Sequence, residues 1–180
     1  NAVEPNKSGM AAIIGADSQT VEKIIFENNL NLEVANDNSP IQVVVSGEMN
    51  EINNSKDLFL KNKIKKFIKL NVSAAFHSKF MSEPQSVLNN FINELNFKSN
   101  NINIISNFSA NISNNMSDIK NSLMNQMANK VKWTESIKKL EETGEKNIIE
   151  IGPGNVLSGL IKRISNSFDI KTISKVSDLE

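Results

Sequence analysis

Residues 9–15 read Gly-Met-Ala-Ala-Ile-Ile-Gly, a short apolar run with glycine at both ends. A continuous apolar run of this length predicts a strand that is buried on both faces. Asp17 or Ser18 can cap the segment that follows it. There Val21 and Ile24 have the spacing of one apolar face, so a helix should follow the strand.

Outward from this strand, the sequence predicts three more strands and a second helix. We expect strands at 32–35, ending in the turn-rich residues 36–40, at 41–46 and at 64–72, and a helix at 50–62. The resulting order, β-α-β-β-α-β, is that of a ferredoxin-like unit. We expect this small subdomain to span residues 8–73.

The second half of the sequence alternates helices with strands. Helices are expected at 83–97, 117–128, 131–143 and after Gly152-Pro153-Gly154, and strands at 103–108, 147–151 and 170–176. Ser117 is the expected cap of the second helix. This alternation indicates part of a parallel α/β sheet, with too few strands for a sheet covered on both faces. We therefore expect residues 74–180 to be one part of a larger α/β subdomain.

Composition argues against several classes of function. The chain has 180 residues and no cysteine, and twenty Lys plus Arg balance twenty Asp plus Glu. Balanced charge argues against nucleic-acid binding, and the lack of cysteine excludes thiolate chemistry. A single histidine, His77, excludes a metal site of several histidines. No apolar run approaches the roughly 18 residues of a membrane span, and no secretory signal is recognised, so we expect a cytoplasmic protein.

His77 is the first candidate for chemistry. It lies between an expected strand and an expected helix, and α/β proteins often place reactive groups in such loops. An imidazole can take up and return a proton near neutral pH. Position alone leaves a second interpretation open, in which His77 is a structural residue held between two elements.

A second candidate is the turn Gly152-Pro153-Gly154-Asn155, which joins a strand to a helix. Main-chain N–H groups at a helix N-terminus can bind an anion. The same glycines and proline also suit a tight turn with no ligand, and spacing alone favours that interpretation.

Several motifs follow one another at a recognisable spacing. They are Gly-Met-Ala-Ala-Ile-Ile-Gly (9–15), Asn-Asp-Asn-Ser-Pro-Ile-Gln-Val-Val-Val-Ser-Gly (36–47), Ser-Ala-Ala-Phe-His-Ser (73–78), Val-Lys-Trp-Thr-Glu-Ser (131–136) and Glu-Ile-Gly-Pro-Gly-Asn-Val-Leu (150–157). Together they resemble the acyltransferase family of malonyl-CoA:acyl carrier protein transacylases over nearly the whole chain. The resemblance implies a ferredoxin-like small subdomain at 8–73 and, at 74–180, the C-terminal part of an α/β-hydrolase-like large subdomain.

The resemblance also implies a reaction. A serine nucleophile takes the malonyl group from malonyl-CoA and passes it to the phosphopantetheine thiol of acyl carrier protein, in a ping-pong mechanism. His77 matches the family's catalytic base, and the main-chain carbonyl of Gln126 matches the group that orients it. Phe76, directly before His77, implies selection of malonyl over methylmalonyl. The family implies no cofactor or metal, a complete enzyme that is a monomer, and no membrane partner.

Departures from the family pattern matter as much. The family's nucleophile lies in a Gly-His-Ser-x-Gly turn, and this sequence contains none. The arginine that pairs with the malonyl carboxylate belongs upstream of Gly9, and Arg163 does not match it. Smaller departures are Ile41, where the family usually has glycine, and Ala75, where it often has proline. We therefore expect the C-terminal portion of a transacylase, inactive on its own.

Two alternatives remain beside a free-standing enzyme of fatty-acid biosynthesis. One is the acyltransferase module of a polyketide synthase, which is less favoured because the chain ends soon after its last expected strand. The other is a domain that binds acyl carrier protein without catalysis, since a chain lacking the serine and the arginine is compatible with it.

Overall fold

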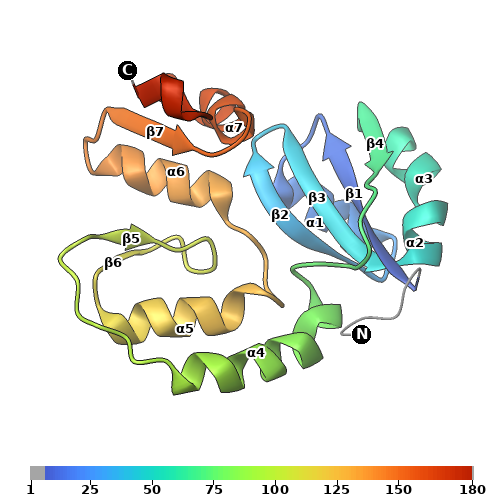
Figure 1. The fold of residues 1–180 in the computed structure, drawn as a ribbon. Coiled ribbons are helices and arrows are strands. Elements are labelled where there is room, and N and C mark those ends of the chain that lie inside the picture. Colours follow the sequence, from blue (N-terminus) through green and yellow to red (C-terminus); the bar gives the residue numbers. More distant parts are fainter. Residues whose placement is uncertain (1–6, 180) are drawn as a thin grey trace.

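The computed structural model describes residues 7–179, which form two regions (Figure 1). The first region contains β1 (Ser8–Ile14), α1 (Ser18–Glu27), β2 (Leu32–Ser39), β3 (Gln42–Glu48), α2 (Met49–Asn54), α3 (Lys56–Lys61) and β4 (Lys66–Lys69). Its strands form one sheet in the order β2-β3-β1-β4, and each neighbouring pair is antiparallel. The predicted order of strands and helices is therefore present, with the predicted helix 50–62 divided into α2 and α3.

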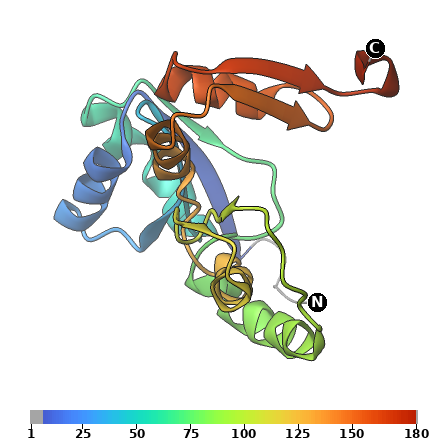
Figure 2. The ribbon, with the colours of Figure 1, turned by 90° about the vertical axis from the view of Figure 1, so that its left-hand side faces the viewer.

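β1 is buried on both faces, as its apolar run predicted. Ala11 and Ile13 belong to the larger core cluster, which the helices α1, α2 and α3 cover. Met10 and Ala12 alternate with them and belong to a smaller cluster on the other face. Figure 2 shows α1 to one side of the sheet. The strand that opens the fold thus contributes to two cores at once.

The second region is built differently. It contains η1 (Lys79–Met81), α4 (Ser82–Glu94), β5 (Ile104–Ile105), β6 (Ile112–Ser113), α5 (Met116–Gln126), α6 (Trp133–Glu142), β7 (Asn147–Ile151), α7 (Val156–Ile164), β8 (Asp169–Ile173) and η2 (Val176–Leu179). β7 and β8 pair in parallel with α7 between them in sequence, as the alternating pattern predicted. β5 and β6 form a separate antiparallel pair. Within residues 7–179, no helix is long and apolar enough to cross a membrane.

β2 is longer than expected, because residues 36–39 continue the strand instead of forming a turn. These residues pair with residues 42–44 of β3, and a second segment bonds to the other edge of the strand. Val131 N donates to Ala35 O at 2.8 Å, and Asp37 N donates to Val131 O at 2.9 Å. The segment around Val131 therefore adds a parallel bridge along β2, and it was wrongly expected to be helical. Tertiary pairing here outweighs the local turn propensity of asparagine and proline.

Other boundaries shift for local reasons. Asn115, and not Ser117, is the N-cap of α5, because its side chain accepts from Ser117 N at 2.8 Å. The expected strand 103–108 is only β5, since Ala110 N donates to Ser106 O at 2.8 Å and the chain turns there. β8 ends at Ile173, where Asp178 accepts from the next two main-chain N–H groups and begins a short helical turn.

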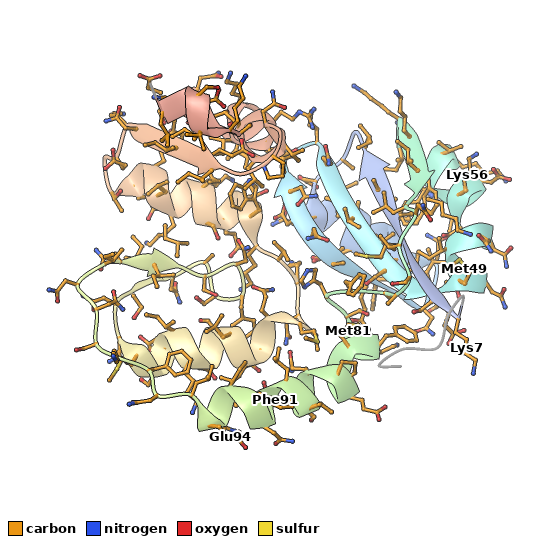
Figure 3. The ribbon with its side chains drawn as sticks, viewed as in Figure 1. Lys7, Met49, Lys56, Met81, Phe91 and Glu94 are labelled. Carbon is orange, nitrogen blue, oxygen red and sulfur yellow. The ribbon has the colours of Figure 1, made fainter. Side chains whose placement is uncertain are left out.

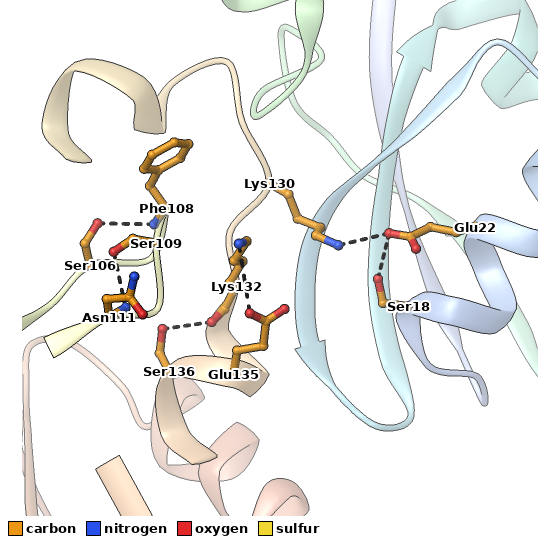
Figure 4. A network of polar contacts seen from close by, with 10 residues as sticks. All are labelled: Ser18, Glu22, Ser106, Phe108, Ser109, Asn111, Lys130, Lys132, Glu135 and Ser136. Carbon is orange, nitrogen blue, oxygen red and sulfur yellow. Dashed lines mark hydrogen bonds and ion pairs between the residues drawn. The ribbon is translucent and has the colours of Figure 1, made fainter. Parts of the chain in front are cut away.

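Polar contacts join the two regions (Figure 4). Lys130 Nζ lies 2.9 Å from Glu22 Oε1 on α1, and Ser18 donates to the same carboxylate oxygen at 3.2 Å. Thr134 Oγ1, at the start of α6, donates to Asp37 Oδ1 at 2.7 Å. An exposed ion pair contributes at most about 1 kcal/mol, so the pair of Lys130 and Glu22 adds little on its own to the joining of the two regions.

Candidate active site

His77 lies in the segment between β4 and η1, where the chain leaves the sheet and enters α4. Its φ angle is +57°, in the left-handed region. For a residue other than glycine, this backbone conformation costs on the order of 1–3 kcal/mol. Contacts with the surrounding residues must therefore hold His77 in it. The conformation of His77 is therefore imposed by its contacts.

Two main-chain carbonyls at the end of α5 hold His77. Its main-chain N donates to Met127 O at 3.1 Å, and its ring Nδ1 lies 3.0 Å from Gln126 O. A carbonyl oxygen can only accept, so Nδ1 carries the proton in this hydrogen bond. The other ring nitrogen, Nε2, then has a free lone pair in the neutral ring. The structure thus brings together His77 and Gln126, which lie far apart in sequence.

Two buried serine hydroxyls hold the residues just before His77 in place. The main-chain N of Ala75 donates to Ser8 Oγ at 3.1 Å, and Ser78 Oγ donates to Ala75 O at 2.6 Å. Ala75 and Ser78 are fully buried, and Ser8 is nearly so. Both main-chain polar groups of the buried residue Ala75 are therefore satisfied by hydroxyls. Ser8 was not identified from the sequence, because a contact between β1 and a distant loop has no local signal.

Phe76 lies directly beside the histidine and remains partly open. Phe76 is 37% exposed, whereas Ala75, the residue before it in the sequence, is fully buried. A phenyl ring with this exposure does not fill a closed core, so it is available to line a site.

The glycine turn does not form part of the histidine site. α7, which follows the turn, and the α4–α5 pair lie at opposite ends of the second region in both ribbon views (Figures 1 and 2). At the N-terminus of α7, the position of an anion is taken by the carboxylate of Glu150 on β7. Its carboxylate accepts from Leu157 N at 3.0 Å and from Ser158 N at 2.8 Å. The helix N-terminus is therefore capped by a residue of the same chain.

Glu150 was not expected from the sequence to cap this helix. A hydrogen bond from Ser158 Oγ, together with those from the main chain, holds the pKa of the Glu150 carboxyl below its usual value. Gly152 and Gly154 have φ angles of +145° and +85°, which favour glycine. An acidic residue shortly before a glycine turn and a helix is the signal that could have predicted this cap.

The groups around His77 include a base but no nucleophile. Within residues 7–179, its hydrogen bonds go to main-chain carbonyls and not to a serine hydroxyl. Arg163 is also engaged elsewhere, since its guanidinium donates to Gln42 Oε1 at 2.6 Å. The described residues can therefore accept a proton at this site, but they do not form a nucleophile–base pair.

A cavity of about 450 Å³ lies between the β5–β6 pair and α5. Its walls are mostly asparagine and serine side chains, with isoleucine and leucine between them. Gln126 lines it as well, while its main-chain oxygen contacts His77. The cavity therefore lies against the same helix end that orients the histidine.

No protein-family model matches the chain. Among curated proteins, the chain is 43% identical over 160 residues to the polyketide biosynthesis protein PksE of Bacillus subtilis, covering 88% of this chain and 21% of that protein. It is 38% identical over 183 residues to the malonyl CoA-acyl carrier protein transacylase of the same organism, covering 99% of this chain and 56% of the transacylase.

Solved structures give the same result. A malonyl-transacylase in complex with the acyl carrier protein of a type II polyketide synthase matches with a TM-score of 0.92 and 29% identity. The match covers 99% of this chain and 58% of that one. The chain thus spans little more than half the length of the transacylases that it matches.

Over nearly its whole length, the chain is thus similar to proteins of the acyltransferase class. Within that class, it belongs to the family of malonyl-CoA:acyl carrier protein transacylases. The expected resemblance is confirmed over nearly the full length of the chain, and so is the α/β fold class.

Proposed function

We propose that this chain carries the general base of a malonyl transfer from malonyl-CoA to the phosphopantetheine thiol of an acyl carrier protein. The supporting observation is the 3.0 Å contact between His77 Nδ1 and Gln126 O. This contact leaves Nε2 of the neutral ring able to accept a proton. The family relationship supplies the reaction type and the two substrates.

In the first half-reaction, Nε2 of His77 takes the proton from a serine hydroxyl that lies outside this chain. The serine oxygen attacks the thioester carbonyl of malonyl-CoA, and a tetrahedral intermediate forms. When the C–S bond breaks, the departing sulfur of coenzyme A takes the proton from His77. A malonyl ester on serine remains. Gln126 O stabilises the transient imidazolium, because it accepts from Nδ1–H throughout.

In the second half-reaction, the phosphopantetheine thiol gives its proton to His77. The sulfur attacks the malonyl ester, and the serine oxygen leaves and recovers the proton. His77 and the serine end as they began, so the transfer requires no cofactor beyond the two thiol carriers. The same atom, Nε2, acts as base and as acid in each half-reaction.

We assign acyl selectivity to Phe76. Its ring is adjacent to His77 in sequence and 37% exposed, which suits a residue that lines the acyl pocket. A phenyl ring beside the α-carbon of the malonyl group leaves no room for an added methyl. Phe76 therefore favours malonyl over methylmalonyl by steric exclusion.

The proposed enzyme has two subdomains in this chain, 8–73 and 74–180. The second is the C-terminal part of a larger α/β-hydrolase-like unit, and the nucleophile and the carboxylate-binding arginine come from the missing part. Large apolar side chains exposed on α4 and β7 support this division, because they lack a covering layer. We place the complete enzyme in the cytoplasm, as a monomer that binds acyl carrier protein.

One observation favours a second setting for the same chemistry. The 43% identity to PksE exceeds the 38% identity to the transacylase of the same organism. Since the chain spans only 21% of PksE, it also resembles one module of a larger polyketide biosynthesis protein. The two settings differ in the carrier protein, so transfer rates to a fatty-acid and to a polyketide carrier protein distinguish them.

The decisive experiment compares the 180-residue chain with a longer protein that includes the segment encoded directly before Asn1. Each is mixed with radiolabelled malonyl-CoA, and acid-stable label on protein is measured. We expect no label on the chain alone and a labelled serine in the longer protein. His77→Asn in the longer protein is the matched control, and it should label slowly.

Two results would contradict the proposal. A labelled serine within residues 1–180 would disprove the missing nucleophile. An upstream segment without Gly-His-Ser-x-Gly, in a protein that binds acyl carrier protein but never labels, would instead establish a non-catalytic binding domain.

A further inference from the structure

The end of α5 has a second attachment, which comes from α4. Gln85 Oε1 accepts a hydrogen bond from the main-chain N of Ala128 at 2.9 Å. Ala128 follows Met127, whose carbonyl accepts from His77 N at 3.1 Å. The N–H held by Gln85 and the C=O that receives His77 therefore belong to one peptide unit.

A peptide unit is planar, so holding its N–H also sets the direction of its C=O. The unit between Met127 and Ala128 cannot turn without losing the bonds to both Gln85 and His77. Hydrogen bonds at the two ends of one unit also polarise each other. The carbonyl of Gln126 is one unit earlier in the same turn. The direction of the Gln126 carbonyl toward the His77 ring therefore depends on how the unit between Met127 and Ala128 is oriented.

His77 and Gln85, which both bond to the end of α5, are also close together in the sequence. α4 begins directly after the loop of His77, and α4 packs along α5 (Figure 1). Met81, labelled in Figure 3 near the first turn of α4, is only 4% exposed and anchors that turn. His77 and Gln85 thus both bond to the end of α5, and the buried Met81 lies between them in the sequence.

We propose that Gln85 is a positioning residue, which holds the end of α5 so that its carbonyls face His77 and select the Nδ1–H tautomer. Without the acceptor on Gln85, the peptide unit of Ala128 turns toward water, and the ring also populates the Nε2–H form. That form has no lone pair at Nε2 and cannot act as the base. The catalytic meaning of the inference rests on the proposed function, whereas the tautomer itself can be measured without turnover.

His77 is the only histidine in the sequence, so the 180-residue chain gives a single set of imidazole ¹⁵N signals. These signals report the tautomer directly at a pH where the ring is neutral. Gln85→Met removes the acceptor and keeps a side chain of similar length. Gln85→Glu keeps an acceptor oxygen. Asn90→Met is the matched control, because Asn90 is exposed on the same helix.

We expect Nδ1–H to predominate in the unmodified chain, in Gln85→Glu and in Asn90→Met. In Gln85→Met, the signals should move to an average of both tautomers while the amide spectrum of the first region stays unchanged. Retention of the Nδ1–H tautomer in Gln85→Met would overturn the proposal. Equal loss of the α4 and α5 amide signals in Gln85→Met and Gln85→Glu would also overturn it, because packing and not the acceptor would then be responsible. Neither result depends on whether malonyl transfer occurs.

Discussion

The two regions of the molecule bury their apolar side chains in opposite ways. In the first region, both core clusters are complete within residues 10–72, and Ile13 and Phe59 are fully buried. In the second, Phe91 on α4 is 63% exposed, and Ile151 on β7 is 80% exposed. Yet it is the second region whose helix end orients His77. The two core clusters and the carbonyl that contacts the His77 ring therefore lie in different parts of the chain.

The exposed side chains in the second region follow the periods of their elements. Val87 and Phe91 lie four residues apart, so they share one face of α4, and the exposed Leu95 follows at the C-cap of the helix. Ile149 and Ile151 alternate along β7, which places them on one face of that strand. Regular stripes of this kind are typical of surfaces that another layer of protein covers. They support our proposal that part of the large subdomain lies outside the chain.

The largest effect that we predict tests whether the chemistry belongs to the end of α5. In the complete protein, His77→Ala should lower turnover by roughly 10²–10⁴, the range for a positioned general base. Gln126→Ala should be far milder, because the main-chain carbonyl remains. Steady-state assays of malonyl transfer measure both. Equal losses in the two variants would contradict the role of the carbonyl.

The second prediction tests the difference in burial with one pair of substitutions. Phe59→Ala should destabilise the first region by about 3–5 kcal/mol, because its buried ring packs on Phe67 with centroids 5.5 Å apart. Phe91→Ala removes the same atoms from an exposed site and should change the free energy of unfolding by less than about 0.5 kcal/mol. Urea unfolding of the 180-residue chain measures both.

A loss of unfolding free energy in Phe91→Ala as large as in Phe59→Ala would contradict the difference in burial between the two regions. It would mean that the stripe on α4 is buried in solution, against another copy or another part of the chain.

Much of the first region could be predicted from sequence, because its signals are local. The apolar run of β1 and the cap of α1 identify their elements directly, and Asp17 is that cap. The length of β2 was not predicted, since residues 36–39 pair with β3 and the distant Val131 also bonds to Ala35 and Asp37. Non-local pairing leaves no mark on the sequence around either partner.

The site shows the same limit. The position of His77 between two elements and its family motif pointed to it, and Gln126 came only from the resemblance. Gln85 and Ser8 could not be predicted, because their partners are main-chain groups, and any sequence provides those. Residues that act on the main chain of a distant segment become visible only in the fold.

The third prediction concerns selectivity, where a smaller effect is expected. In the complete protein, Phe76→Ser should shift the ratio of kcat/KM toward methylmalonyl-CoA by about 10–200-fold, the range for one methyl group in a pocket. Assays with both acyl-CoA substrates measure the ratio. If both rates fall together with no change in their ratio, Phe76 supports the loop and does not select the acyl group.

The smallest effects are expected from two carboxyl groups, one in each region, and they should have opposite signs. Burial raises the pKa of Asp37 on β2, although the hydrogen bond from Thr134 and the charges of Lys130 and Lys138 partly oppose this and Glu135 adds to it. Between its ordinary and its raised pKa, the folded state binds more protons than the unfolded state. The free energy of unfolding therefore falls as pH rises through that window. Asp37→Asn, which keeps an acceptor for Thr134, should gain stability relative to the unmodified chain over the same rise.

Glu150 on β7 should do the reverse. Its pKa is lowered, first by the hydrogen bond from Ser158 and then by main-chain donors, so the unfolded state binds more protons in the window below the ordinary value. Its stabilisation is present above that window and is lost as pH falls through the lowered pKa. Glu150→Gln should therefore lose stability relative to the unmodified chain as pH rises. Urea midpoints for both variants across acidic to neutral pH give the two slopes. Slopes of the same sign would mean that Asp37 is stabilised by its lysines more than it is penalised by burial.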